Sequence, residues 1–308
     1  MGRYTLRRLL QLIPVFLGTT FLIYVLVWAV PGDPLAGQCG ERGCPDAFVA
    51  RMEDKFHLAD PVWVQYGYYL ASLLRGDFGE TFAGISVGEL ISQAYPITAK
   101  LALVAIIIEA IIGITAGVVT GMRRGGYLDN LVLVSTLFLI AIPTFVTGFV
   151  VQSLLGVEWG IISPTVPSDP SVTDLIVPGF ILASGSMATV SRLTRVSFVE
   201  NRRADYVRTA VAKGLTSSRV TGVHLLRNSL IPVVTFIGID IGNLMGGAIV
   251  TEGIFNIRGI GFMLFQAIGR KESSLVVSIV VILVIVYLFF NLVVDLLYGV
   301  LDPRIRYE

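Results

Sequence analysis

The sequence predicts an all-α polytopic membrane protein with six transmembrane helices. Of its 308 residues, 54% are hydrophobic and only 15% are charged, more apolar surface than one water-soluble core of this length can hide. A helix needs about 20 apolar residues to cross roughly 30 Å of hydrocarbon. Six segments meet or approach that length, namely residues 9–30, 97–121, 128–155, 175–191, 230–251 and 275–298.

The first apolar segment begins like a secretory signal, because Arg3, Arg7 and Arg8 precede it. Its apolar run is longer than that of a signal peptide, and no small-residue cleavage site occurs before Pro31. We therefore expect a retained transmembrane helix.

The basic residues predict the direction of the helices, since cytoplasmic loops are enriched in Lys and Arg. Residues 31–96 hold four basic and nine acidic residues, and we expect them outside. Residues 192–227 hold eight basic residues against two acidic ones, and we expect them in the cytoplasm. Six spans then place both termini in the cytoplasm, and only alternation assigns residues 252–274 to the outside.

We expect two parts: residues 1–96, with the first helix and an extracytoplasmic loop, and a five-helix core of residues 97–308 that carries a basic loop at 192–229. The outer loop is too long for a turn, and its apolar residues have helical spacing. It should form a small cap that either receives a partner or only covers helix ends. The spaced residues are Val62, Tyr66, Tyr69, Leu70, Leu73 and Leu74.

The outer loop also contains both cysteines of the chain, Cys39 and Cys44, in the stretch "CGERGC". An extracytoplasmic position is oxidising, and the intervening glycines allow a tight loop. We predict a disulfide between them, with two free thiols as the alternative.

The stretch "DYVRTAVAKGL" predicts a short helix in the basic loop. Asp205 is a candidate N-cap and Gly214 a C′ residue, which gives a helix over residues 206–213. Pairs of adjacent residues that recur every four positions form one apolar stripe on this helix. The residues are Tyr206, Val207, Ala210, Val211, Gly214 and Leu215. A second helix should begin near Ser217 or Ser218. The alternative is an amphipathic helix held at the membrane surface by anionic headgroups.

Four stretches in order resemble the B-type permease subunit of dipeptide and oligopeptide ABC importers. They are "PGDP" at 31–34, "DPVWVQYGYYLASLLRGDFG" at 60–79, "ADYVRTAVAKGL" followed by "RNSLIP" within 204–232, and "GGAIVTEGIFNIRGIG" at 246–261. The resemblance runs from end to end of the chain. It implies a type I ABC importer permease fold in a bacterial plasma membrane, with this chain forming half of the translocation path.

The resemblance also implies partners: a second permease subunit of the C type, two ATP-binding subunits or a fused ATPase, and an extracytoplasmic substrate-binding protein. The short helix would dock into the ATPase, and the expected ATPase-coupling residues are Asp205, Tyr206, Val207, Arg208, Thr209, Ala210, Val211, Lys213, Gly214 and Leu215. The cargo would be a dipeptide or oligopeptide, or another cargo of this family such as haem.

The chain has no G-x-x-x-x-G-K-[ST] phosphate loop, so we expect a non-catalytic subunit without a bound cofactor, with ATP and Mg on its partners. A net charge of +1 indicates no nucleic-acid partner. The only histidines, His57 and His224, are expected on opposite sides of the membrane, which argues against a metal site.

Glycines at fourfold spacing predict close packing of the second and fifth spans. They are Gly113, Gly117 and Gly121, and Gly238, Gly242 and Gly246. The same spans contain Glu109, Asp240 and Asn243. A carboxylate in lipid is costly, so this polar group should either line the translocation path or form a buried hydrogen-bond network.

Two further classes stay open at this point. An ion-coupled secondary transporter could use Glu109 and Asp240, but such transporters typically show an inverted repeat or broken helices, and no convincing repeat is evident. A non-transporting membrane scaffold is the other alternative.

Overall fold

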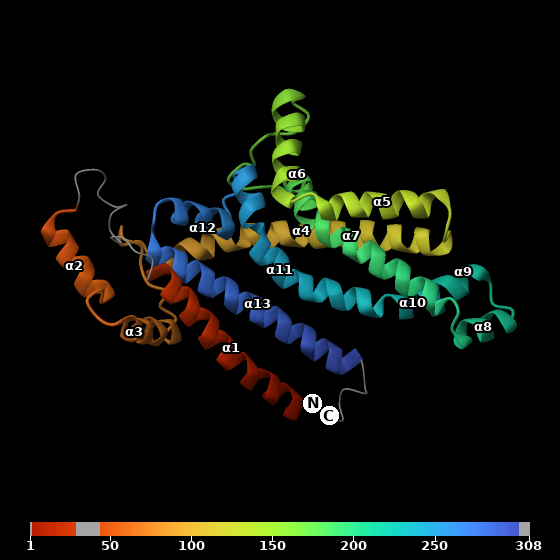
Figure 1. Cartoon of the computed structure of the whole chain (residues 1–308), viewed down its shortest axis with the longest axis horizontal. Coiled ribbons are helices and arrows are strands. Elements are labelled where there is room, and N and C mark those ends of the chain that lie inside the picture. Colours follow the sequence, from red (N-terminus) through yellow and green to blue (C-terminus); the bar gives the residue numbers. More distant parts are fainter. Residues whose placement is uncertain (1, 29–43, 302–308) are drawn as a thin grey trace. The chain divides into compact units, whose positions relative to one another are not determined.

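The computed structural model describes residues 2–28 and 44–301, and this part of the chain is helical apart from connections and one isolated bridge between Glu80 and Ser86. The architecture confirms the predicted all-α class (Figure 1). The main helices are α1 (Gly2–Trp28), α2 (Asp46–Phe56), α3 (Val62–Leu74), α4 (Val87–Met122), α5 (Tyr127–Ala141), α6 (Thr144–Val151), α7 (Ile176–Asn201), α8 (Asp205–Ala212), α11 (Ile231–Phe255), α12 (Ile260–Gly269) and α13 (Ser273–Leu301).

Four of these helices, α1, α4, α7 and α13, are each long and apolar enough to cross a membrane. Three bent pairs of helices also pass this test when their halves are joined, which gives up to seven spans. The chain divides into two compact units, residues 1–99 with 256–308 and residues 100–255.

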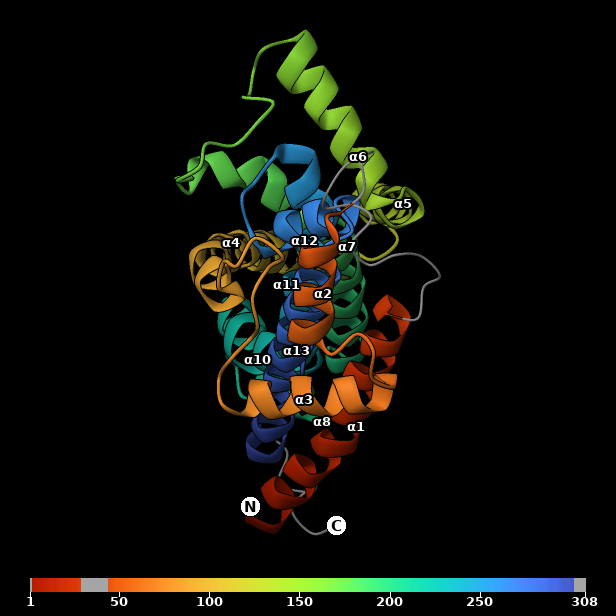
Figure 2. The ribbon, with the colours of Figure 1, turned by 90° about the vertical axis from the view of Figure 1, so that its left-hand side faces the viewer.

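In the first unit, α1 packs along α13, and α3 runs across α1 (Figure 2). Tyr24 of α1 is buried with Val277 and Val281 of α13, and the apolar side of α3 packs against this group. The Tyr66 hydroxyl lies 2.8 Å from the Thr20 hydroxyl, which ties α3 to α1 at a polar point.

The helical spacing predicted for the outer loop is confirmed by α3. Four of the six spaced residues pack against the α1–α13 group, namely Val62, Tyr66, Tyr69 and Leu73. Leu74, at the end of the helix, is 81% exposed. The predicted disulfide stays a prediction, because Cys39 lies outside the described residues.

In the second unit, α7 packs against α5, α6 and α11. Half of its 26 residues are buried, including small residues such as Gly179, Ala183 and Ser184. Small side chains on a central helix allow its neighbours to approach closely. Helix α7 is therefore the core of this unit, and it leads directly into the basic loop.

The third apolar segment predicted to span the membrane, residues 128–155, is bent in the structure. The axis turns by 97° between α5 and the following helix, which continues from α6 into a π-helical segment at Gln152–Glu158 (Figure 1). Pro143 explains the break, because its ring disfavours helical geometry at the preceding residue. Ile142 accordingly has extended angles, φ −91° and ψ 123°.

The predicted outer connection at residues 252–274 is also more structured than expected. Helix α11 extends to Phe255, and α12 occupies ten further residues of this stretch. The N–H of Ile260, at the start of α12, donates to the Thr98 hydroxyl at 2.9 Å. A helix in this stretch was not foreseen, because the prediction followed only the apolar runs long enough to span a membrane.

Candidate functional site

The short helix of the basic loop is α8, shifted by one residue from the prediction. Its N-cap is Ala204, which has extended angles, and Asp205 is the first helical residue instead of the cap. At the other end Gly214 adopts φ +75°. The Gly214 N–H donates to the Val211 carbonyl and the Leu215 N–H to the Ala210 carbonyl, the pattern of a Schellman motif.

The predicted single stripe of α8 divides into two faces. Val207 and Ala210 are buried, at 6% and 5% exposure, and pack inside the unit. Val211 is 60% exposed and Tyr206 37% exposed. The repeat of residue pairs every four positions could not separate the two faces. The two residues of each pair lie about 100° apart around the helix, so the repeat covers a wide arc and does not say which part of it is buried.

The exposed face of α8 combines these two apolar side chains with charge. The side chains of Asp205 and Arg208 are 97% and 74% exposed, and they form an ion pair in which Arg208 Nη1 lies 3.6 Å from Asp205 Oδ1. Thr209, Ala212 and Lys213 are also exposed. Within the described residues, no other part of the chain covers this exposed face of α8.

The second helix of the loop begins at Ser217, as predicted. It consists of a short α-helical turn, a π-helical segment at Val220–Leu225 and the turn α10 (Leu226–Ser229). Val220 and Leu225 are buried together with Val207 and Ala210 around Phe198 of α7. The loop is therefore anchored to the end of α7 by an apolar cluster.

Phe198 also contacts α4. A Cβ placed on Gly121 would lie 2.9 Å from the Phe198 ring, so the absence of a side chain at Gly121 makes room for this ring. Nearby, Arg202 donates to the Met122 carbonyl at 3.3 Å. The ends of α4 and α7 and the basic loop thus meet at one side chain.

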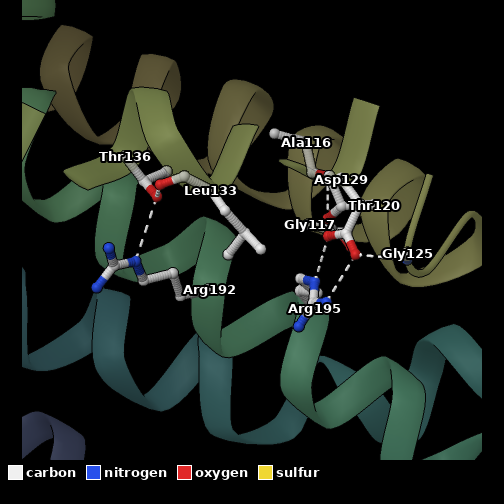
Figure 3. A network of polar contacts seen from close by, with 9 residues as sticks. All are labelled: Ala116, Gly117, Thr120, Gly125, Asp129, Leu133, Thr136, Arg192 and Arg195. Carbon is white, nitrogen blue, oxygen red and sulfur yellow. Dashed lines mark hydrogen bonds and ion pairs between the residues drawn. The ribbon is translucent and has the colours of Figure 1, made fainter. Parts of the chain in front are cut away.

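Near this junction, an ion pair between the buried Asp129 and the partly exposed Arg195 connects α5 to α7 (Figure 3). Arg195 donates through Nε and Nη2 to the two carboxylate oxygens of Asp129, at 2.6 and 2.7 Å. The Gly125 N–H donates to Asp129 Oδ2 at 2.8 Å. One helical turn away from Arg195, Arg192 donates to the Thr136 hydroxyl at 3.2 Å.

The glycines of α4 lie against α7. A Cβ on Gly113 would lie 2.6 Å from Val190 Cγ1, and a Cβ on Gly117 would lie 2.5 Å from the Ser191 carbonyl oxygen. In α11, Gly242 is buried and Gly238 half-buried. Gly246 is different, because a Cβ there would meet nothing within 4 Å of this chain, so close packing at this position is not found within the described residues.

The carboxyl groups of Glu109 and Asp240 lie together within the second unit and interact electrostatically. Glu109 is fully buried and Asp240 is 7% exposed. Asn243 donates to Asp240 Oδ1 at 3.3 Å, as its position three residues later in the helix allows. Asp240 and Asn243 line a cavity of about 360 Å³.

Two polar features were missed by the sequence reasoning. The Asp129–Arg195 pair joins residues 66 positions apart, and pairing over such a distance leaves no periodic signal. Gln152 donates to the carbonyls of Pro164 and Ile254, at 2.7 and 2.6 Å. A lone amide within an apolar run was the only sequence signal for Gln152, whereas Arg195 was counted only as part of the basic loop.

The fold and this site define a class: a multi-pass α-helical membrane protein whose basic loop presents an amphipathic helix on the end of a core helix. The comparisons with known proteins give the family. Residues 113–307 match the model of the binding-protein-dependent transport system inner membrane component, and residues 1–102 match that of its N-terminal region. The chain belongs to this family of transport-system membrane components.

Similar proteins cover the whole chain. It is 35% identical to the dipeptide transport system permease protein DppB of Alkalihalophilus pseudofirmus and 35% identical to the protein of the same name in Escherichia coli K12. It is 34% identical to the oligopeptide transport system permease protein AppB of Bacillus subtilis. Each comparison covers 100% of this chain and 100% of the relative.

Proposed function

We propose that this chain is a transmembrane subunit of an ATP-driven, binding-protein-dependent importer of dipeptides or oligopeptides. The observation that carries the proposal is full-length similarity to permeases named for dipeptide and oligopeptide transport. The anchored helix α8 supports it, since an importer subunit without a nucleotide-binding loop needs a contact through which a motor can act on it.

In this proposal, a second permease subunit completes the translocation path, two ATP-binding subunits or a fused ATPase hydrolyse ATP, and an extracytoplasmic protein delivers the cargo. The ATPase contacts the exposed face of α8, which includes Tyr206, Arg208 and Val211. Val207 and Ala210 take part by attaching α8 to Phe198, with which they are buried in one apolar cluster. A movement of α8 that follows closure of the ATPase would therefore be transmitted to α7 through these packed side chains.

The charge distribution supports an orientation with both termini and the basic loop in the cytoplasm. The outer loop with α2 and α3 would then lie on the opposite side, where the binding protein docks. Helix α3 carries exposed aromatic residues suited to such a contact, with Trp63 70% and Tyr68 52% exposed.

The test is reconstitution of the chain with its candidate partners in proteoliposomes, followed by uptake of a labelled dipeptide. Uptake should require internal ATP, external binding protein and this chain. Uptake by the purified chain alone, driven by an ion gradient without ATP, would instead support a secondary transporter. Failure of any ATPase to co-purify with the chain from its native membrane would favour a scaffold.

A further inference from the structure

Two pairs of adjacent arginines meet where α4 and α7 end. Arg123 and Arg124 follow α4 in the turn that leads to α5, and Arg202 and Arg203 follow α7. Nη1 of Arg202 donates to the Met122 carbonyl at 3.3 Å, which places the second pair beside the first. All four arginines are exposed, and we call them the arginine patch.

The positive charge of the arginine patch is not balanced by the rest of the described chain. None of the ion pairs found among the described residues includes any of the four arginines. Asp129, which follows the first pair in sequence, is already paired with Arg195 (Figure 3). Asp205, which follows the second pair, is paired with Arg208. Four positive charges therefore face one unpaired acidic residue, Glu200, and such an excess attracts an anionic ligand.

Exposed apolar side chains adjoin the arginine patch. Tyr127, at the start of α5, is 79% exposed, and Met122, at the end of α4, is also exposed. The exposed apolar surface continues along α5 with Leu131, Val134 and Phe138. Tyrosine is enriched where a membrane meets water. The patch therefore lies where a cationic surface borders an apolar helix face.

We infer that the arginine patch binds the phosphodiester headgroup of an anionic phospholipid, whose acyl chains lie along the exposed apolar face of α5. Clusters of basic residues next to membrane helices attract anionic headgroups. A guanidinium also presents a planar fork of N–H donors that matches two oxygens of a phosphate, whereas a lysine ammonium acts as a point charge. All four basic residues of the patch are arginines.

A lipid fits this corner better than a free phosphate or the ATPase. A free phosphate would use the arginines but would leave Tyr127 and the apolar face of α5 uncovered. The exposed face of α8, proposed as the ATPase contact, mixes acid and base in the Asp205–Arg208 pair, whereas the patch is cationic throughout. A headgroup held by both arginine pairs would connect the turn after α4 to the end of α7, next to Phe198.

The test measures lipid binding by the purified full-length chain. The chain, in a neutral detergent, is titrated with dioleoylphosphatidylglycerol or dioleoylphosphatidylcholine, and bound lipid is counted by native mass spectrometry. The unmodified chain should bind the anionic lipid more tightly. A basic residue near an anionic surface contributes about fivefold in affinity, so removing two of them should reduce this preference by about 10-fold or more. The two double variants are Arg123→Gln with Arg124→Gln, and Arg202→Gln with Arg203→Gln.

Two further sets of variants separate a defined site from a general effect of charge. Lys213→Gln with Arg219→Gln is the matched control, because it removes the same charge from exposed positions of the same basic loop, and it should keep the preference. Replacing each arginine pair by two lysines keeps the charge but removes the fork. Those variants should show a preference between that of the unmodified chain and that of the glutamine variants.

A second measurement locates the lipid on the unmodified chain. Phosphatidylglycerol with a photoactivatable diazirine near its headgroup is added, the sample is irradiated, and labelled peptides are identified by mass spectrometry. Label should concentrate on the peptides that contain Met122, Tyr127 or Leu131, severalfold above the label from the matching phosphatidylcholine. Excess inorganic phosphate should not prevent labelling, because the acyl chains contribute to binding.

Each outcome supports or overturns the lipid site. An equal loss of preference in the patch variants and in the control, or equal labelling by the two lipids, would overturn it. Displacement of the lipid by inorganic phosphate would indicate an anion site without lipid. Loss of ATPase binding by the patch variants in neutral lipid would assign the patch to the ATPase instead. If a glutamine variant aggregates, labelling of the unmodified chain decides. Neither measurement uses cargo, so failure of peptide uptake would overturn the proposed function alone.

Discussion

Arg195 and Asp129 form a two-point ion pair that joins α7 to α5, with both contacts at 2.7 Å or less. Asp129 is almost fully buried, and the Arg195 side chain is 21% exposed. Arg195 lies three residues before Phe198 in α7, and the basic loop packs against Phe198. The ion pair therefore fixes the position of α5 relative to the helix that carries the loop.

Removing one member of this pair should destabilise the protein. Asp129→Ala leaves a guanidinium without its carboxylate, a change that costs on the order of 3 kcal/mol for buried pairs. The thermal unfolding temperature of the detergent-solubilised chain should fall clearly. Asp205→Ala removes the acid of the exposed Asp205–Arg208 pair and should change it little, since exposed pairs contribute about 0–1 kcal/mol. Equal effects of the two substitutions would contradict this assignment.

Gly117→Ala should disturb the contact between α4 and α7. The added methyl group would lie 2.5 Å from both the Ser191 carbonyl oxygen and Thr194 Cβ, and overpacking of this kind costs about 1–3 kcal/mol. Gly185→Ala is the matched control, because a Cβ there meets nothing within 4 Å. The yield of monodisperse protein in size-exclusion chromatography should fall for Gly117→Ala and hold for Gly185→Ala; the reverse order would refute the contact.

The two faces of α8 should respond differently to charge. Val211→Asp places a carboxylate on the exposed face, so the chain should fold normally but lose binding to its ATPase in a pull-down assay. Val207→Asp places it in the cluster around Phe198, so the loop should become sensitive to limited proteolysis. A cross-linker placed at position 211 should reach the ATPase, whereas one at position 207 should not. Folded Val211→Asp that still binds the ATPase would contradict the docking role.

Gln152→Leu should loosen the end of α11. The amide of Gln152 donates to the carbonyls of Pro164 and Ile254, and the substitution leaves both acceptors unsatisfied at about 1–3 kcal/mol each. Hydrogen exchange at the Val166 amide, which donates to the Phe255 carbonyl at 2.9 Å, should accelerate. Ser153→Ala, at an exposed neighbour, is the control and should leave this rate unchanged.

Much of the fold could be predicted because lipid imposes long apolar helices, and the sequence shows them directly. The short helix was equally visible, since Gly214 marks its end and the residues before it are periodic. Its start was misplaced by one residue, because Asp205 serves equally well as a cap or as a first-turn acid. The break at Pro143 was missed because apolar composition continues unchanged on both sides of the proline.

The candidate site could be predicted only in part. Glu109, Asp240 and Asn243 were singled out because polar groups are rare in apolar runs. That the two carboxyl groups lie together could not be predicted, since 131 positions separate them in the sequence and contact between distant helices leaves no local pattern. The division of α8 into an anchored and an exposed face likewise depends on Phe198, a residue outside the motif.

The shared contact of Phe198 with Gly121 and with the base of α8 has a consequence for protein engineering. A chimaera that receives the loop of a related permease would inherit its choice of motor through the exposed face. The chimaera would transmit the movement of the ATPase to α7 only if the grafted helix also packed against the Phe198 ring. Grafts that begin before residue 198 and keep a glycine at 121 should therefore outperform those that begin at the helix itself.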